Sequence, residues 1–232
     1  MLLAGLMPAG AALAESPILA AAYAAPTTRY PHGVLGDAVE WGALDLTLAD
    51  GQRVKIVLPE DRVFEDVAPR LIDVDLDGDA EVVVVESDQG RGARLAIHDA
   101  RGLVAATPFI GQRFRWLAPV GGADLDGDGA VEIAFVDRPH LARVLRVWRF
   151  RPDGAGGGRL EEVAAAAGLT NHRIGEPDIA GGLRRCGGRI EMVTADAGWA
   201  RIVATRLEDG QLLSRDLGAH RGRESFRAAM AC

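Results

Sequence analysis

Two short segments of the chain carry carboxylates at a spacing that suits a metal ion. Residues 73–81 read DVDLDGDAE and residues 124–132 read DLDGDGAVE, so the segments begin 51 residues apart. Both place acidic residues at positions one, three, five and nine, and glycine at position six. Carboxylates this close repel one another unless a hard cation lies between them, and glycine lets the backbone wrap around the ion. We therefore predict that calcium is bound by Asp73, Asp75, Asp77 and Glu81 in the first segment and by Asp124, Asp126, Asp128 and Glu132 in the second.

An apolar run follows each acidic segment, Val82–Val85 after the first and Ile133–Val136 after the second. β-Branched and aromatic residues of this kind favour strands. An EF-hand needs a glutamate at position twelve and a helix on each side, whereas position twelve here is Val84 or Phe135. The sequence therefore predicts calcium loops that lead into β-strands. The alternative is a pair of solvated acidic turns that hold no ion.

The two segments resemble the FG-GAP or VCBS repeat of integrin-type β-propellers. The residues that carry the resemblance are Asp73, Asp75, Asp77, Gly78 and Glu81, and Asp124, Asp126, Asp128, Gly129 and Glu132. The resemblance implies that each loop joins the first and second strands of a propeller blade. It also implies that carboxylates and one backbone carbonyl hold the calcium. Two structural calcium ions are then expected.

Hairpin patterns recur four times along the chain, over residues 44–58, 94–107, 144–163 and 202–213. In each, apolar residues flank a turn that contains Asp or Gly. A degenerate acidic segment precedes the last hairpin: Asp178 lies 54 residues after Asp124, but Arg184 and Arg185 stand where carboxylates are expected. We therefore predict an all-β fold, a small β-propeller of about four blades over residues 28–232, two of them with DxDxDG calcium loops.

The start of the chain resembles an export signal. Residues 1–14 are apolar and end in Ala12-Leu13-Ala14, which is similar to a signal-peptidase site. A charged segment in front of the apolar run is missing, so either the translation start lies upstream or the signal is weak. A disordered Ala-rich tail is the alternative. We expect a signal peptide at 1–14, a linker at 15–27 and a periplasmic or secreted protein.

The chain has two cysteines, Cys186 and Cys232. In an oxidising compartment they could pair and attach the C-terminal tail, itself a closing strand or a helix, to the last blade. Two free thiols are the alternative. Neither cysteine lies in a C-x-x-C motif or a His-rich context, which disfavours a zinc or redox site.

Charge limits the classes of partner. The net charge is -7, with 33 acidic and 26 basic residues, which argues against nucleic acid or an anionic membrane as the main partner. No segment is long and apolar enough to span a membrane. The expected partner is an unknown protein or a carbohydrate, and the oligomeric state is left open.

A ligand site is expected on the face opposite the acidic loops. The loops there would bring together aromatic, Arg and His side chains, which suit a carbohydrate or other polar ligand. The residues predicted to bind it are His32, Arg115, Trp116, His140 and His172. The alternative is that the tryptophan packs between blades and the arginine serves solubility.

Catalytic motifs are missing from the sequence: there is no G-x-S-x-G, H-E-x-x-H, P-loop or dinucleotide fingerprint. We therefore favour a binding or scaffold module with structural calcium. Two alternatives stay open. One is a periplasmic hydrolase- or lyase-like enzyme with its site on the face opposite the calcium loops. The other is a structural partner of a membrane-anchored complex.

Overall fold

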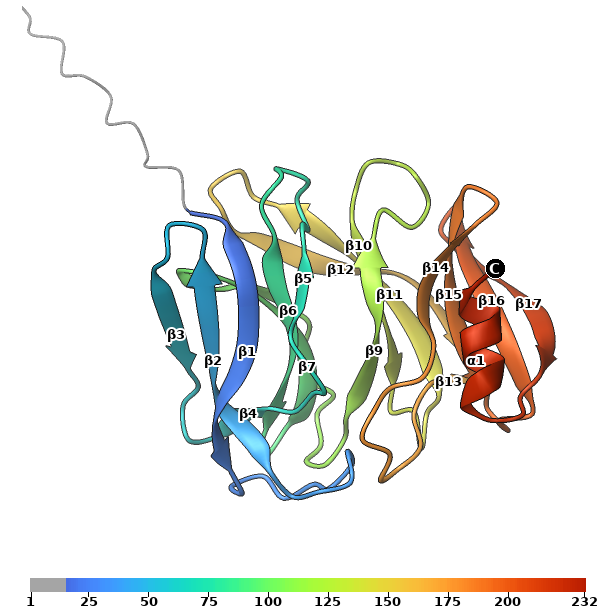
Figure 1. The fold of residues 1–232 in the computed structure, drawn as a ribbon, viewed down its shortest axis with the longest axis horizontal. Coiled ribbons are helices and arrows are strands. Elements are labelled where there is room, and N and C mark those ends of the chain that lie inside the picture. The colour runs from blue at the N-terminus through green and yellow to red at the C-terminus, as the bar shows by residue number, and fades with distance from the viewer. Residues whose placement is uncertain (1–15) are drawn as a thin grey trace, which may run out of the picture.

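The computed structural model describes residues 16–232, and its regular structure there is almost entirely antiparallel β-sheet (Figure 1). The strands of this part of the chain are β1 (Ile18–Thr27), β2 (Glu40–Leu48), β3 (Arg53–Val57), β4 (Arg62–Phe64), β5 (Arg70–Ile72), β6 (Glu81–Asp88), β7 (Gly92–Asp99), β8 (Gly102–Ala106), β9 (Leu117–Ala123), β10 (Glu132–Asp137), β11 (Val144–Pro152), β12 (Gly158–Ala167), β13 (Leu169–Thr170), β14 (Gly182–Cys186), β15 (Arg189–Asp196), β16 (Arg201–Glu208) and β17 (Gln211–Ala219). A helix, α1 (Arg223–Met230), follows the last strand. Within residues 16–232 no helix has the length and apolar character that a membrane crossing requires. The predicted all-β fold is confirmed.

The strands form four groups that follow one another along the chain and lie side by side (Figure 1). They are β1–β3, β5–β8, β9–β12 and β14–β17. Each strand of the last three groups pairs with the next one in an antiparallel meander. Short turns make this arrangement possible. Between β14 and β15, for example, Gly187 and Gly188 both have positive φ, 59° and 79°, as a two-residue hairpin turn requires.

Hydrogen bonding unites these groups into three sheets instead of four separate blades. The short strand β4 pairs with β2 through Trp41 and Phe64, and with β6 through Phe64 and Glu86. The first two groups therefore share one eight-stranded sheet, beside a four-stranded and a five-stranded sheet. Within residues 16–232, no strand of the first group pairs with a strand of the fourth group.

The core lies between neighbouring groups, and the apolar runs of the sequence supply it. Along β6, Val82 and Val84 pack toward the first group, whereas Val83 and Val85 pack toward the third. Successive side chains of a strand point to opposite faces of its sheet. A strand that is buried on both faces therefore carries a continuous apolar run, Val82–Val85 in β6 and Ile133–Val136 in β10.

The segment expected to be a linker, residues 15–27, instead contributes β1. This strand pairs along nearly the whole length of β2. Its inward-facing Ala21 and Tyr23 pack against the core between the first two groups, next to Leu44 and Leu46. The expectation was wrong for Ile18–Thr27 because the many alanines masked the alternation of inward and outward residues. The expected signal peptide, residues 1–14, lies outside the described residues.

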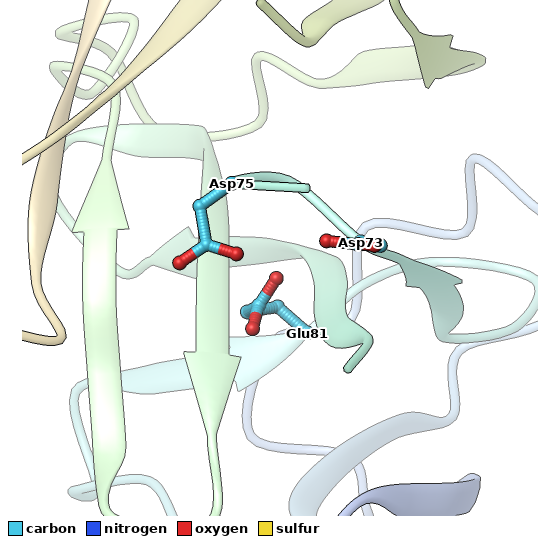
Figure 2. A group of neighbouring side chains, drawn as sticks. All are labelled: Asp73, Asp75 and Glu81. Atoms are coloured by element: carbon cyan, nitrogen blue, oxygen red, sulfur yellow. The ribbon is translucent and has the colours of Figure 1, made fainter. Parts of the chain in front are cut away.

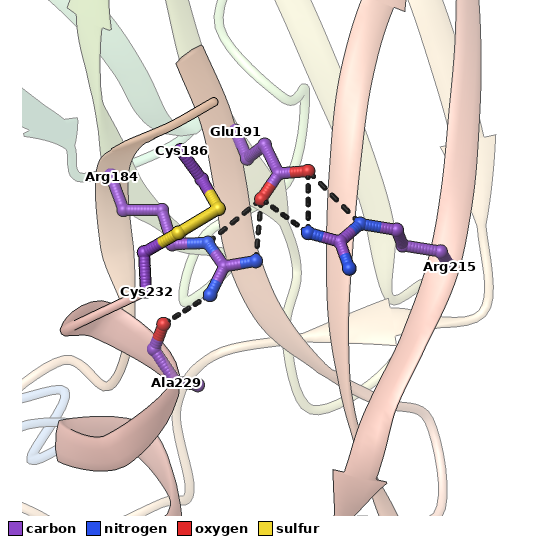
Figure 3. Close-up of a disulfide and its surroundings, with 6 residues drawn as sticks. All are labelled: Arg184, Cys186, Glu191, Arg215, Ala229 and Cys232. Carbon is purple, nitrogen blue, oxygen red and sulfur yellow. Dashed lines mark hydrogen bonds and ion pairs between the residues drawn. A yellow bond between two sulfur atoms is a disulfide. The ribbon is translucent and has the colours of Figure 1, made fainter. Parts of the chain in front are cut away.

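Helix α1 covers the outer face of the fourth group. Phe226 packs against Val193 of β15 and Ile202 of β16. A disulfide joins Cys186, at the end of β14, to Cys232 beyond the helix, across 46 residues (Figure 3). The two cysteines are therefore paired and are not free thiols, the alternative that the sequence left open. Because disulfides persist in oxidising compartments, it is compatible with an extracytoplasmic location.

A buried ion-pair network lies beside this disulfide (Figure 3). Glu191 accepts hydrogen bonds from Arg184 Nε over 2.8 Å and from Arg215 Nε over 3.0 Å. Arg184 also donates to the carbonyl oxygen of Ala229 in α1. Burial alone would raise the pKa of Glu191, but the two guanidiniums outweigh it and lower the pKa. Arg184, one of the two arginines that interrupt the degenerate acidic segment, therefore fastens the helix to the sheet.

A loop of the first group contacts the loop that leads into the fourth group, at the end of the strands away from the acidic segments. The backbone N–H of Gly175 donates to the carbonyl oxygen of Val34 over 2.9 Å. Gly36, with a φ of 100°, comes so close that an added Cβ would lie 2.8 Å from the Gly175 oxygen. The sequences around these glycines, residues 30–37 and 171–178, are similar to one another.

Candidate metal centre

Both acidic segments are loops at the same end of the strand groups (Figure 1). The first joins β5 to β6 and the second joins β9 to β10, so each connects the first and second strands of its group. In each loop the ninth residue, Glu81 or Glu132, is also the first residue of the following strand. Pairing of that strand with its neighbours therefore fixes the glutamate relative to the aspartates.

Three carboxylates converge in the first loop. Oxygens of Asp73, Asp75 and Glu81 lie within 4.8 Å of one another, and Figure 2 shows the three side chains facing a common space. Backbone N–H groups hold them there: Val74 donates to Glu81 Oε2 over 3.0 Å, and Gly78 donates to Asp73 Oδ2 over 3.1 Å. Gly78 has a φ of 100°, which only glycine adopts without strain.

No arginine or lysine of residues 16–232 forms an ion pair with Asp73, Asp75 or Glu81; Arg101, which lines the same groove, pairs with Asp99. Burial raises the pKa of Glu81 to about 7, and the charges of Asp75 and Asp77 add to the shift. Burial, followed by the charge of Asp77, also raises the pKa of Asp75. Oδ1 of Asp73 is buried and has no hydrogen-bond partner. Crowded, partly dehydrated carboxylates of this kind fit a hard divalent cation.

The second loop repeats this geometry. Oxygens of Asp124, Asp126 and Glu132 lie within 4.8 Å of one another. Leu125 N donates to Glu132 Oε2 over 2.9 Å, and Gly129 N donates to Asp124 Oδ2 over 3.0 Å. These bonds match those of the first loop position by position. By this arrangement of oxygens, each of the two acidic clusters could hold a metal ion.

A guanidinium sets the second loop apart. Arg149 of β11 forms ion pairs with Asp126 over 2.8 Å, with Asp128 over 2.6 Å, and with Glu132. Burial raises the pKa of Glu132, and the positive charge of Arg149 opposes that shift. Arg149 is not among the residues predicted from the sequence. The signal that could have identified it is the register of the β10–β11 hairpin, which pairs Glu132 directly with Arg149.

Two of the predicted ligands lie outside the compact clusters. Asp77 Oδ1 accepts a hydrogen bond from Asp79 N over 2.9 Å, and Asp128 Oδ1 accepts one from Ala130 N over 3.0 Å. Each carboxylate thus stabilises the turn of its own loop. This role in the turn explains why an acidic residue occupies position five of both loops.

The residues expected to bind a ligand form a cluster at the other end of the strands, with the exception of Arg115. The ring centroid of Trp116 lies 6.3 Å from that of His140 and 4.9 Å from that of His172. Trp116 Nε1 donates to the carbonyl oxygen of Glu65 over 2.8 Å, and the carboxylate of Glu65 lies 2.5 Å from His32 Nδ1. Four of the five residues predicted to bind a ligand therefore lie near one another: His32, Trp116, His140 and His172.

Burial limits what this cluster can bind. Trp116 is 2% exposed and His172 is 1% exposed, so these rings pack in the interior and do not form an open stacking surface. His32 and His140 are partly exposed. Arg115 donates to the carbonyl oxygen of the preceding residue over 3.0 Å. The accessible rings of the cluster are thus those of His32 and His140; Arg115, outside the cluster, is also partly exposed.

The histidine pair has a defined proton arrangement. His172 Nε2 lies 2.8 Å from the carbonyl oxygen of Glu176, which can only accept, so His172 donates there. Its Nδ1 is then the acceptor for His140 Nε2, 2.9 Å away. Burial lowers the pKa of both histidines, to about 4 for His140, and the neighbouring His172 adds to that shift. Near pH 7 both rings are therefore neutral.

Glu65 is the centre of a second polar group at this end. It is fully buried, and its carboxylate accepts a hydrogen bond from Ser87 Oγ on one oxygen while His32 bonds the other. Serine and histidine thus share one carboxylate and are not bonded to each other. Nucleophilic catalysis needs the base within reach of the hydroxyl, so this group is not arranged as a nucleophile with its base.

A groove with a volume of about 1090 Å³ lies at the acidic-loop end. The second acidic loop forms one wall, and the turns of the fourth group form the other. Arginines line that second wall: Arg185, Arg189 and Arg206. The ligand site predicted from the sequence lies on the opposite face.

Comparison with known protein families finds a match over the two acidic loops. Residues 73–135 match the family described as FG-GAP-like repeat, a stretch that contains both acidic loops, the strand that follows the first and most of the strand that follows the second. No curated protein matches the chain. The chain therefore carries an FG-GAP-like repeat over residues 73–135, consistent with an FG-GAP/VCBS repeat protein.

Proposed function

We propose that this protein is an exported calcium-binding β-propeller that acts as a binding or scaffold module and in which calcium is structural. One observation carries the proposal: Asp73, Asp75 and Glu81 converge with no positive partner among the described residues, and Asp73 Oδ1 is buried without a donor. The FG-GAP-like repeat over residues 73–135 supports it.

Calcium suits the loop better than magnesium does. Calcium accepts six to eight oxygen ligands in flexible geometry, whereas magnesium demands a smaller octahedral shell and keeps several waters. The residues that would hold the ion are Asp73, Asp75 and Glu81, with Asp77 beside them. A bound ion supplies the positive charge that this loop lacks.

The structural consequence concerns the short strand β5. It has three residues and pairs with β6 from Arg70↔Val83 to Ile72↔Glu81. The acidic loop follows Ile72 directly and ends on Glu81, the partner of Ile72. A loop held in one conformation therefore keeps this pair in register.

A binding role is supported by features of the surface. The groove at the acidic-loop end offers charged walls and a volume of about 1090 Å³, slightly above the upper end of the range typical of ligand sites. The net charge of -7 disfavours nucleic acid. We expect the ligand to be a protein or a carbohydrate.

Export is supported by the disulfide between Cys186 and Cys232. A bond of this kind persists in a periplasm or outside the cell and is rare in a reducing cytosol. The apolar sequence of residues 1–14 fits the same location.

The proposal is tested by Asp75→Asn. This change keeps an oxygen that can accept the hydrogen bond from Asp77 N, found at 3.3 Å, but it removes a charge from the cluster. We expect the melting temperature of the variant to fall below that of the wild type in calcium and to be no lower than it in EGTA, because the charge serves the metal-bound loop and only adds repulsion without an ion.

Asp50→Asn is the matched control, since Asp50 accepts a similar hydrogen bond from Gln52 N over 2.9 Å in a turn outside both loops. It should behave alike in calcium and EGTA. An equal loss for Asp75→Asn under both conditions would show that its carboxylate serves the turn and not an ion.

A further inference from the structure

The second acidic loop contains a positive charge that belongs to the protein itself. Arg149 lies directly opposite Glu132 in the β10–β11 hairpin. Its three guanidinium nitrogens each meet a different carboxylate: Nε meets Glu132, Nη1 meets Asp128 over 2.6 Å, and Nη2 meets Asp126 over 2.8 Å. One side chain therefore engages three of the four predicted metal ligands of this loop.

Burial strengthens the contacts with Glu132 and Asp126, whereas Asp128 is half-exposed. The side chain of Arg149 is 12% exposed and that of Glu132 is 0% exposed. Ion pairs that are shielded from water are screened little by salt, and separating one leaves a buried charge without a partner. The planar guanidinium also keeps several hydrogen bonds at once, which a mobile lysine would not do as well.

The first loop has no such group. On β7, His98 pairs with Val82, so Asp99, the next residue, occupies the place that corresponds to Arg149. The carboxylate of Asp99 is engaged by Arg101, whose Nε donates to it over 2.8 Å. Within residues 16–232 no ion pair reaches Asp73, Asp75 or Glu81. The two loops thus share a sequence pattern but differ in what lies between their carboxylates.

We infer that Arg149 is the resident cation of the second loop, so that only the first loop takes up a divalent cation. The inference rests on the proposed metal binding and assigns it to one loop. A calcium ion needs six to eight oxygens, and in the second loop the carboxylates that would supply them are already bonded to the guanidinium. The second loop keeps its shape without metal.

The test is the number of calcium ions bound, measured by isothermal titration of EGTA-treated and dialysed protein with calcium chloride up to about 1 mM, the range of weak extracellular sites. The wild type should bind one ion. Asp75→Asn should abolish binding, whereas Asp126→Asn, the same change at the same position of the other loop, should leave one ion bound.

Arg149→Gln should create a second site, because it removes the guanidinium and frees the carboxylates. Its control is Arg146→Gln on the same strand. Arg146 also bonds two carboxylates, Asp137 over 3.0 Å and Glu162 over 2.7 Å, but neither belongs to a loop. This control should bind one ion. Should Arg149→Gln fold poorly, the pair Asp75→Asn and Asp126→Asn still decides the question.

The possible results separate the two proposals. Two ions in the wild type, or a loss of one ion in Asp126→Asn, would overturn the role of Arg149 and leave calcium binding intact. One ion in both the wild type and Arg149→Gln would also overturn it. Binding by Arg149→Gln alone would support the role of Arg149 but refute the first loop as a site. No binding by any of these proteins would overturn both.

Discussion

At the scale of residues, identical motifs differ in their neighbours. Both loops place acidic groups at the same positions and receive the same backbone hydrogen bonds, for example on Glu81 and Glu132. The difference comes from one side chain of another strand, Arg149. Sequence motifs report the local loop, whereas the charge that balances it can come from a residue far along the chain.

Buried acids at the other end of the strands make the stability depend on pH. Glu40 is 2% exposed. Burial, followed by the charges of Glu65, Asp37 and Asp66, raises its pKa from 4.5 to about 9. The folded protein therefore keeps a proton on Glu40 between these values while the unfolded chain loses it. Its contribution to stability is complete below pH 4.5 and is lost as the pH rises through 9.

Glu40→Gln should remove this dependence, because glutamine resembles the protonated acid and carries no charge. We expect equal melting temperatures for variant and wild type at pH 5 and a higher one for the variant at pH 8. The gain in unfolding free energy is at most about 1.4 kcal/mol per pH unit. Thermal unfolding at both pH values measures it. Glu60→Gln, at an exposed carboxylate, is the control; the same gain there would refute the burial of charge as the cause.

At the scale of elements, prediction succeeded where the sequence is strongly patterned. The runs Val82–Val85 and Ile133–Val136 became β6 and β10, which are buried on both faces. It failed for β1, where alanine hides the alternation, and for β4, whose three residues join two groups. Such short or small-residue strands depend on their partners, and the partners are not visible in the local sequence.

The contact between the loops at residues 30–37 and 171–178 gives a second prediction. Gly36 has a φ of 100°, and a Cβ there would lie 2.8 Å from the backbone oxygen of Gly175. Gly36→Ala should therefore lower the free energy of unfolding by more than about 1 kcal/mol, as measured by denaturant titration.

Gly51→Ala separates the clash from the backbone strain. Gly51 also has a positive φ, 85°, but nothing lies within 4 Å of an added Cβ. The loss for Gly36→Ala should exceed that for Gly51→Ala. Equal losses would mean that the contact between the two loops adds nothing to stability.

At the scale of the whole molecule, four strand groups and two acidic loops follow from the repeat in the sequence. The FG-GAP-like match over residues 73–135 covers the part where the pattern is strongest. The joining of the first two groups into one sheet, and the loop contact between the first and fourth groups, depend on long-range hydrogen bonds. A single sequence does not report such pairings, since each needs residues far apart in the chain.

The same limit applies to the candidate site. The carboxylates that converge in each loop could be predicted because a loop of nine residues brings them together by itself. The ring cluster of Trp116, His140 and His172 could be located by the repeat, but its burial could not. Burial depends on how neighbouring loops fold over the cluster.

The most direct test of structural calcium is the melting temperature of the purified protein in calcium and in EGTA, with magnesium as control. At a calcium concentration 100 times the dissociation constant, one site adds about 2.7 kcal/mol, or roughly 5–10 °C for a chain of this size. We predict a rise of this order in calcium and little change in magnesium. Equal melting temperatures in calcium and EGTA would contradict structural calcium and leave the two loops as solvated acidic turns.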